Sequence, residues 1–337
     1  MLPALAVAEA LAARGTRVTL AGSPERAEAR LVPDAGFELD TFAVSGLPRE
    51  PGAALARALW DDVRAPIACD RILARRRPDV VLGGGGYVSG PMALAAARRR
   101  IPVALMEADA HLGLANRLAA PLARRVFLAF PIPGREPPKH LVTGRPIPAR
   151  SRAVPQELAR RLFELPDEGP VLLVAGGSLG ARSLNDLAVE SFGATGPAVL
   201  HLCGEREHER LRRRVSRPDY RLLPFTEDYG AALGAADLVV SRAGGGVWEI
   251  AAAGKPAILV PYPFATADHQ TKNARYFQTA GGAILMSETE LGRVPEVVRS
   301  LLGDQRRLAE MRAAMLRVAR PDAADEIAEE VLRLAAA

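Results

Sequence analysis

Three glycine-rich stretches have the residue types and the spacing to bind an anion: residues 83–90, 176–182 and 241–249. Each follows a short aliphatic run and precedes a segment with helical spacing. Glycine lets the backbone turn sharply and approach a ligand closely, and the first turn of a helix offers unpaired N–H groups to a phosphate. A tight turn without any ligand also needs glycine, so one loop of this kind is a weak indication of phosphate binding.

The third stretch predicts a diphosphate site more strongly than the other two. Gly244, Gly245 and Gly246 are consecutive and open a helical segment, so their main-chain N–H groups can surround a diphosphate. Glu249 lies about one turn into that segment, where its carboxylate can accept hydrogen bonds from both hydroxyls of a ribose. A glutamate at this position also favours the helix dipole without any ligand, and this alternative stays open.

A fourth candidate is the stretch of residues 261–270, which follows another aliphatic run. His269 and Gln270 offer imidazole and amide groups that suit the hydroxyls of a sugar. Asp268 beside them also fits the N-cap of a helix. No predicted strand ends in an Asp-x-Asp pair, and the other histidines lack the spacing of metal ligands, so the sequence predicts no metal site.

The elements that must position these stretches are short strands alternating with helices. Segments such as residues 2–13, 90–99 and 179–191 have apolar residues at helical spacing. Continuous apolar strands separated by helices indicate parallel sheets covered on both faces, because each crossover needs a helix. The predicted strands are residues 17–21, 80–83, 103–107, 126–130, 141–143, 171–175, 198–203, 220–224, 238–241, 257–261 and 283–286.

The same alternation occurs twice along the chain, which predicts two domains. A proline-rich stretch at residues 131–155 interrupts it, and we place the boundary near residues 147–155. The expected organisation is an N-terminal domain of residues 1–150 and a C-terminal domain of residues 151–319. The last helical segment, residues 320–337, is expected to return to the first domain. The predicted fold class is α/β, with two Rossmann-like domains facing a cleft.

Composition excludes several classes of protein. Hydrophobic residues make up 49% and charged residues 25% of the 337 residues, which is typical of a globular chain rather than a disordered or fibrous one. No run of about 18 apolar residues is present, so we expect neither a transmembrane span nor a secretory signal, and a cytosolic chain. The net charge is +5, but no aromatic residues interleave with the arginine runs, so we expect no nucleic acid partner.

Several motifs together resemble the MurG family, glycosyltransferases of family 28 that act in peptidoglycan synthesis. The resemblance spans nearly the whole chain. Its two most specific blocks are Gly-Gly-Tyr-Val-Ser-Gly-Pro at residues 85–91 and Gly-Gly-Ser-x-Gly-Ala-Arg at residues 176–182. Further blocks are Pro-Ala-Leu-Ala at 3–6, Gly-Lys-Pro at 254–256, Asp-His-Gln at 268–270 and Pro-Asp-Ala-Ala at 321–324.

The resemblance implies a GT-B fold that binds UDP-N-acetylglucosamine (UDP-GlcNAc) in the C-terminal domain. Ser178 and residues 244–249 would hold the diphosphate and ribose, Thr226 would lie at the uracil, and Gln270 would contact the sugar. Asp109 stands where the family usually has an asparagine that reaches the donor sugar. With Arg242, which follows the last strand before the glycines, the candidate donor-site residues are Asp109, Ser178, Thr226, Arg242, Gly244, Gly245, Gly246, Val247, Trp248, Glu249 and Gln270.

The implied reaction is inverting transfer of GlcNAc to the C4 hydroxyl of undecaprenyl-pyrophosphoryl-MurNAc-pentapeptide, the step from lipid I to lipid II. Residues 84–86 would face the acceptor's pyrophosphate. No cofactor and no metal are expected; main-chain N–H groups would stabilise the departing UDP. A lipid acceptor implies a peripheral enzyme on the cytoplasmic face of an anionic membrane, with other cell-wall proteins as further partners. Residues 55–77 are either an apolar and basic membrane surface or a helix packed in the core.

The chain departs from the family pattern at its start and in the binding loops. The family's first strand and its Gly-Gly-Thr-x-Gly-His loop precede Pro3, so the expected catalytic histidine lies upstream of Met1 and we assign no catalytic residue. A half without this central strand leaves two sheet edges unpaired. We therefore expect the chain as given to be poorly stable and inactive, and an upstream-extended form to be active. Arg145 and Pro148 stand in a family Asn-Pro-Val-Arg block, and Trp248 replaces a small residue.

Two other functions remain open. One is a GT-B glycosyltransferase with a different lipid or small-molecule acceptor, which acceptor profiling would distinguish. The other is a catalytically inactive homologue that binds a nucleotide sugar without turnover. An NAD-dependent dehydrogenase fits less well, because no Gly-x-Gly-x-x-Gly unit is followed by a strand that ends in an acidic residue.

Overall fold

The structure is a computed structural model that describes residues 1–44, 53–177 and 180–337, with the backbone alone for residues 53–63. Ser178 therefore lies outside the described residues. The chain divides into two compact units. The first is Met1–Pro146 together with Pro321–Ala337, and the second is Ile147–Arg320.

The first unit contains two hydrogen-bonded parallel sheets. One pairs β1 with β2, and the other has the order β3-β4-β5-β6. From the sequence, a half that starts on a helix is expected to leave two parallel edges without a partner. In the described part of the chain, β1 and β2 are the two ends of one sheet, and β3 and β6 are the two ends of the other. The strands are β1 (Thr19–Gly22), β2 (Glu38–Thr41), β3 (Val81–Gly83), β4 (Val103–Glu107), β5 (Arg125–Leu128) and β6 (His140–Val142).

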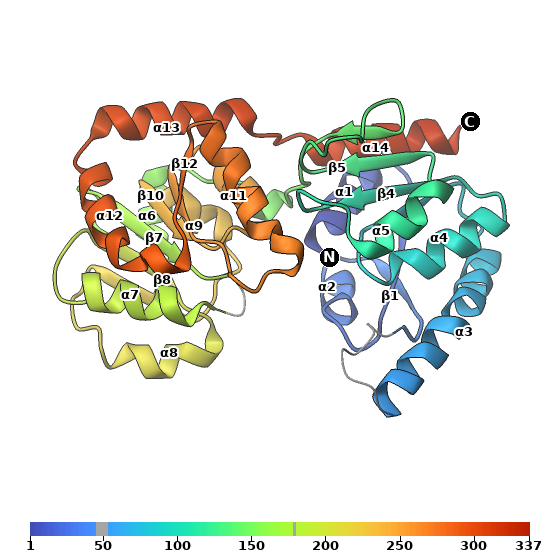
Figure 1. Cartoon of the computed structure of the whole chain (residues 1–337), viewed down its shortest axis with the longest axis horizontal. Coiled ribbons are helices and arrows are strands. Elements are labelled where there is room, and N and C mark those ends of the chain that lie inside the picture. The colour runs from blue at the N-terminus through green and yellow to red at the C-terminus, as the bar shows by residue number, and fades with distance from the viewer. Residues whose placement is uncertain (45–52, 178–179) are drawn as a thin grey trace. The chain divides into compact units, whose positions relative to one another are not determined.

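Helices cover both faces of the β3–β6 sheet, because β4 is buried along its whole length and must be covered on each side. One cluster of buried side chains joins the sheet to α3, α4 and α5, and the other joins it to α1 and α14. The C-terminal helix α14 thus packs beside the N-terminal helix α1 (Figure 1). The helices are α1 (Leu2–Ala12), α2 (Glu28–Asp34), α3 (Ala53–Arg76), α4 (Ser89–Arg98), α5 (Leu114–Ala119), η1 (Ala120–Leu122) and α14 (Ala323–Ala335).

The second unit is built on one parallel sheet with the order β12-β11-β10-β7-β8-β9. This order reverses direction between β7 and β10, the arrangement of a Rossmann fold. Its strands are β7 (Val171–Ala175), β8 (Ala198–Leu202), β9 (Tyr220–Leu223), β10 (Leu238–Ser241), β11 (Ala257–Leu259) and β12 (Ala283–Leu285). The central strands β7, β10 and β11 are buried throughout, as a sheet covered on both faces requires.

Helices lie between successive strands of this unit, and η2 and α6 precede its first strand whereas η4, α12 and α13 follow its last. One cluster of buried side chains joins α7, α8, α12 and α13 to strands of this sheet, and Figure 1 shows these helices around the strands. The helices are η2 (Ala149–Ser151), α6 (Gln156–Leu162), α7 (Arg182–Phe192), α8 (Glu205–Arg212), α9 (Tyr229–Ala235), α10 (Val247–Ala252), η3 (Thr266–Asp268), α11 (His269–Thr279), η4 (Glu288–Arg293), α12 (Val294–Leu302) and α13 (Gln305–Val318).

Every strand predicted from the sequence is present, with ends that shift by at most two residues. The sequence did not predict β2, because Glu38 and Asp40 make it look polar. Asp40 is nevertheless buried, and Arg76 of α3 donates to its carboxylate at 2.7 Å. The hydrogen bond from Arg76 lowers the pKa of Asp40 despite burial, so this strand keeps a charge inside by pairing it.

Candidate functional site

The candidate residues of the second unit gather at one edge of its sheet. β12, β11, β10 and β7 are neighbours and all run parallel, so the loops that follow their carboxyl ends meet at the same edge. This edge, near the point where the strand order reverses, is where open parallel sheets bind ligands. The glycine cradle (Gly244, Gly245 and Gly246) follows β10, and the loop after β11 leads into α11, whose second residue is Gln270.

The glycine cradle is open where a ligand would need space. A Cβ atom added to Gly244 would meet no atom within 4 Å, although the residue lies between the buried Ala243 and the start of α10. A Cβ on Gly246 would lie 3.4 Å from the Glu249 carboxylate and 3.9 Å from the Tyr229 hydroxyl. The carboxylate of Glu249 therefore stands beside the cradle.

Two residues counted with the cradle have side chains that belong to the core. Val247 is fully buried, and Trp248 is 1% exposed. The Trp248 ring packs edge-on against Phe277 of α11, with 5.3 Å between ring centroids. The expectation of a donor contact therefore has to be corrected for these two side chains: apolar burial directs them inward, and only their main-chain atoms remain beside the cradle.

Arg242 has a different surrounding from the one expected. Its Nη1 donates to the carbonyl oxygens of Val260 and Pro261 at 3.2 and 3.1 Å. The same nitrogen lies 2.5 Å from Glu288 Oε2, and Nη2 donates to Ser183 Oγ at 2.9 Å. The sequence suggests that this guanidinium faces the diphosphate; in the structure it is hydrogen-bonded to protein groups, because acceptors from α7, from the end of β11 and from η4 surround it.

The loop after β11 is held in a left-handed turn. Ala267 and Asp268 both have positive φ, at 52° and 53°. Lys272 Nζ donates to the Ala267 carbonyl at 2.9 Å. Asp268 occupies the N-cap of α11 but makes no capping hydrogen bond with its side chain. Strain of this kind persists where the surroundings enforce it, and it often occurs at functional sites.

Gln270 links this loop to the following helix. Its Oε1 accepts a hydrogen bond from the Tyr262 amide at 2.9 Å, so the side chain lies across the loop. His269 Nδ1 is 2.8 Å from the Thr266 carbonyl. Phe264, at the tip, is 80% exposed. Gln270 is thus on the same sheet edge as the cradle.

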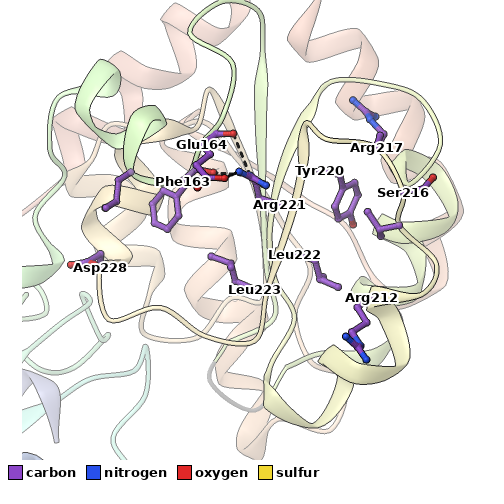
Figure 2. A pocket seen from close by; sticks show the side chains of 12 residues that line it. Phe163, Glu164, Arg212, Ser216, Arg217, Tyr220, Arg221, Leu222, Leu223 and Asp228 are labelled. Carbon is purple, nitrogen blue, oxygen red and sulfur yellow. Dashed lines mark hydrogen bonds and ion pairs between the residues drawn. The ribbon is translucent and has the colours of Figure 1, made fainter.

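Thr226 follows β9, at the far end of the strand order from β12. Its hydroxyl accepts a hydrogen bond from the Asp228 amide at 3.1 Å, and Phe225 before it is half exposed. A cavity of about 570 Å³ runs along β9 nearby (Figure 2). Asp228 and Leu223 are among its lining residues, whereas the cradle residues are not.

In the first unit, Glu107 organises the loop that carries Asp109. Its carboxylate accepts hydrogen bonds from the amides of Ala108 and Gly113 at 3.0 and 2.9 Å, and from Asn116 Nδ2 at 2.9 Å. Glu107 ends β4 and is 8% exposed. The glycine loop after β3 is adjacent, since a Cβ on Gly85 would lie 3.4 Å from the Met106 carbonyl.

Sequence reasoning missed four polar residues that the structure places beside these loops: Glu107, Ser183, Tyr229 and Glu288. Glu107 is the one charged residue of the predicted strand 103–107 and could have been selected on that basis. Nothing in the sequence pattern singled out the other three, because they come from elements far apart along the chain.

Family models match both halves of the chain. The glycosyltransferase family 28 N-terminal domain matches residues 1–128, and the family 28 C-terminal domain matches residues 171–327. The chain belongs to glycosyltransferase family 28. This family 28 chain has the GT-B fold class predicted from the sequence, with parallel α/β sheets in both units.

Individual relatives place it within the MurG group. A transferase of Halorhodospira halophila, named UDP-N-acetylglucosamine–N-acetylmuramyl-(pentapeptide) pyrophosphoryl-undecaprenol N-acetylglucosamine transferase, is 42% identical over 97% of this chain and 92% of its own length. One of the same name from Acidithiobacillus ferrooxidans is 41% identical over 99% of this chain and 94% of its own. The structure of Acinetobacter baumannii MurG superposes with a TM-score of 0.77 at 29% identity, covering 98% of this chain and 95% of that one.

Within the described residues, no helix has both the length and the apolar character needed to cross a bilayer. Exposed leucines do occur on the first unit. Leu114 and Leu118 of α5 are 66% and 71% exposed, and Leu122 in η1 is exposed as well. In the described part of the segment 55–77, Cys69 is buried and Ile67 is exposed.

Proposed function

We propose that this family 28 chain transfers N-acetylglucosamine from UDP-GlcNAc to the C4 hydroxyl of undecaprenyl-pyrophosphoryl-MurNAc-pentapeptide, in peptidoglycan synthesis. The observation that carries the proposal is 42% identity, over nearly the full length of both chains, to a transferase named for this reaction. The hydroxyl oxygen attacks the anomeric carbon, the bond from that carbon to the UDP oxygen breaks, and the configuration inverts. UDP leaves with the bonding electron pair, and the hydroxyl proton passes to a base.

The geometry of the second unit supports capture of the donor by main-chain groups. The open space at Gly244 can admit the diphosphate, and the Glu249 carboxylate beside Gly246 suits the ribose hydroxyls. Gln270 is held across its loop by Tyr262 and can present its amide nitrogen to the sugar. Asp109 in the first unit is the further candidate contact to the sugar, and Ser178 and Thr226 complete the expected set.

Donor capture in this proposal needs no divalent cation. Hydrogen bonds from N–H groups at Gly244, Gly245 and Gly246 would stabilise the charge that develops on the departing UDP. Titration with UDP in the presence of EDTA and then of Mg²⁺ tests this part. We expect the same affinity in both, and a strict requirement for Mg²⁺ would contradict it.

The function itself is tested by acceptor profiling. The protein is incubated with radiolabelled UDP-GlcNAc and, separately, with lipid I, diacylglycerol and a small phenolic aglycone. Label transfer to lipid I alone supports the proposal. Transfer to another acceptor would identify a different GT-B glycosyltransferase, and tight UDP-GlcNAc binding without transfer to any acceptor would identify an inactive homologue.

The donor site is tested with Gly244→Ala. Because an added methyl group meets no protein atom at Gly244, the fold should tolerate it, while the methyl group occupies space intended for the diphosphate. We expect UDP binding to weaken by about tenfold or more without loss of thermal stability. The control is Gly292→Ala in η4, where an added Cβ also meets nothing within 4 Å. Equal UDP affinity in both variants would place the diphosphate elsewhere.

A lipid-linked acceptor requires the enzyme to reach a membrane, and α5 offers a suitable surface. Leu114 and Leu118 are four residues apart, so they project from one face of the helix, and Arg117 between them is exposed. Apolar side chains flanked by arginine suit an anionic bilayer. We propose that this face meets the cytoplasmic leaflet.

Flotation with phosphatidylglycerol vesicles tests this surface. We expect Leu118→Ser to reduce the bound fraction several-fold, because it removes apolar area that would enter the bilayer. The matched control is Leu158→Ser on α6 of the second unit, a leucine that is 59% exposed. Equal loss in both variants, or no loss in either, would contradict docking through α5.

A further inference from the structure

We propose that the ion pair between Arg242 and Glu288 is a positioning device for the donor site: it sets the loops of the second unit relative to one another and acts on the donor through those loops. The inference rests on the proposed function, because it concerns the same site. It adds Glu288 and Ser183, which no motif singled out, and it changes the part that Arg242 plays.

The ion pair between Arg242 and Glu288 is bidentate and largely shielded from water. Arg242 Nη1 lies 2.5 Å from Glu288 Oε2, and Nη2 lies 3.3 Å from Glu288 Oε1. The Arg242 side chain is 11% exposed and that of Glu288 29%. A guanidinium and a carboxylate that meet through two parallel hydrogen bonds fix each other's orientation as well as their distance. Lysine cannot reproduce this planar arrangement.

The same two nitrogens of Arg242 also bind two further segments. Nη2 donates to Ser183 Oγ, in the first turn of α7 after the glycine-rich loop of β7. Nη1 donates to the carbonyls of Val260 and Pro261, where β11 ends. One guanidinium therefore joins the loop after β10 to the start of α7, to the residues that follow β11 and to η4 after β12.

The connections continue to groups that are candidates for donor contact. The Arg242 guanidinium carbon lies 5.7 Å from the ring centre of Tyr262, within the range of a cation–π interaction. The Tyr262 amide in turn donates to Gln270 Oε1. On the other side, Arg242 precedes Gly244 by two residues, so a shift of the arginine moves the start of the cradle.

A pair of this kind is poorly explained by stability alone. Replacing a buried ion pair with apolar groups is often neutral or stabilising, because burial of two charges costs about what their attraction returns. Burial would raise the pKa of Glu288, yet hydrogen bonds from Arg242 and Ser183 outweigh it and lower the pKa, so the carboxylate stays charged. What the pair supplies is a defined geometry among four loops.

The test compares Glu288→Gln with Asp219→Asn. Asp219 forms a matching pair with Arg217 at the β9 edge, away from the cradle, with 2.7 Å between Oδ1 and the arginine Nε. Each substitution removes one charge and keeps the shape of the side chain. UDP affinity is measured by titration calorimetry, KM for UDP-GlcNAc and kcat by lipid I transfer, and thermal stability by calorimetry.

We expect Glu288→Gln to weaken UDP binding and raise KM for UDP-GlcNAc by about tenfold, with kcat changed less than KM. Asp219→Asn should lower thermal stability without changing the UDP affinity or KM for UDP-GlcNAc. In the wild type, KM for UDP-GlcNAc should rise as acid protonates Glu288, and this rise should be absent in Glu288→Gln. A purely structural role would lower the stability of both variants alike and leave the pH profile unchanged.

Ser183→Ala provides a milder second variant if Glu288→Gln folds poorly. It removes one hydroxyl, and we expect UDP affinity to fall about threefold. Wild-type UDP affinity in both Ser183→Ala and Glu288→Gln would overturn the inference. A wild-type protein that binds no UDP would instead overturn the proposed function, so the two failures are distinguishable.

Discussion

The Glu107 carboxylate and the Gly113 amide are 2.9 Å apart, so the last residue of β4 closes the loop of residues 108–113 on itself. The amides of Ala108 and Asp109 also point at this carboxylate, at 3.0 and 3.3 Å. A charged acceptor that receives several N–H groups is stronger than a neutral one. Glu107 therefore determines where the loop holds Asp109.

Glu107→Gln should loosen this loop. The glutamine amide has one oxygen, and its NH₂ group would face N–H donors that now meet a carboxylate. We expect a loss of about 1–3 kcal/mol in the free energy of unfolding, and a higher KM for UDP-GlcNAc if Asp109 contacts the sugar. Glu9→Gln on the exposed side of α1 is the control in the same unit. Unchanged urea unfolding in Glu107→Gln would refute this account of the loop.

The glycine-rich loop after β7 allows a matched pair of substitutions. Gly177 and Gly180 both have positive φ, at 84° and 75°. A Cβ on Gly180 would lie 2.3 Å from the Cys203 carbonyl oxygen, whereas a Cβ on Gly177 would meet nothing within 4 Å. Gly177→Ala should cost about 1–2 kcal/mol for the left-handed backbone alone.

Gly180→Ala should cost clearly more than Gly177→Ala, because two main-chain segments must also separate. Urea unfolding monitored by tryptophan fluorescence measures both. The sequence has two tryptophans, Trp60 and Trp248. Both variants are therefore made in a Trp60→Phe background, so that the fluorescence reports on Trp248 of the second unit. Equal losses in the two variants would mean that the contact between Gly180 and Cys203 relaxes without cost.

The sequence predicted the sheets well and the side-chain roles unevenly. A continuous apolar run such as residues 171–175 forms a strand that is buried on both faces. The alternation of such strands with helices along the sequence therefore predicts the fold class. β2 was not predicted, because the burial of its Asp40 depends on an ion pair with Arg76, which is 36 residues away in the sequence. Arg242 was assigned to the donor because charge beside a glycine cradle suggests it, but its partners come from loops whose proximity only the folded chain creates.

Trp248 illustrates the same limit, and its substitutions separate packing from binding. The side chain is 1% exposed and packs against Tyr276 and Phe277. Trp248→Ala should lower the free energy of unfolding by about 3–5 kcal/mol, because it leaves a large cavity. Trp248→Phe should retain UDP affinity within about threefold. A large loss of UDP affinity in a stably folded Trp248→Phe variant would show that the Trp248 side chain contributes to donor binding.

A buried histidine makes the stability of the second unit sensitive to acid. His201 of β8 lies 2.9 Å from the Tyr220 hydroxyl through Nδ1 and 2.9 Å from Asn185 Oδ1 through Nε2. Asn185 Oδ1 can only accept, so Nε2 carries the proton and Nδ1 accepts from the tyrosine. Asn185 then donates to the Cys203 carbonyl at 2.8 Å. The neutral imidazole satisfies this network, and a second ring proton would break it.

Burial lowers the pKa of His201 from its ordinary value of 6.5 to about 3. Between these two pKa values, His201 is protonated in the unfolded chain and neutral in the native state. The free energy of unfolding therefore falls as pH decreases from 6.5 towards 3. The slope approaches about 1.4 kcal/mol per pH unit, or about 2 kcal/mol between pH 7 and pH 5. Above pH 6.5 both states are neutral and this contribution is constant.

His201→Gln removes the titrating group and leaves an amide that can still hydrogen-bond in the core. Its free energy of unfolding at pH 7 should be lower than that of the wild type, because the geometry of the imidazole is lost. The difference should narrow by about 2 kcal/mol on going to pH 5, since only the wild type loses stability to His201 protonation. His208→Gln on α8 is the control and should follow the wild-type curve. A difference that stays constant with pH would show that His201 is protonated in the native state as readily as in the unfolded chain.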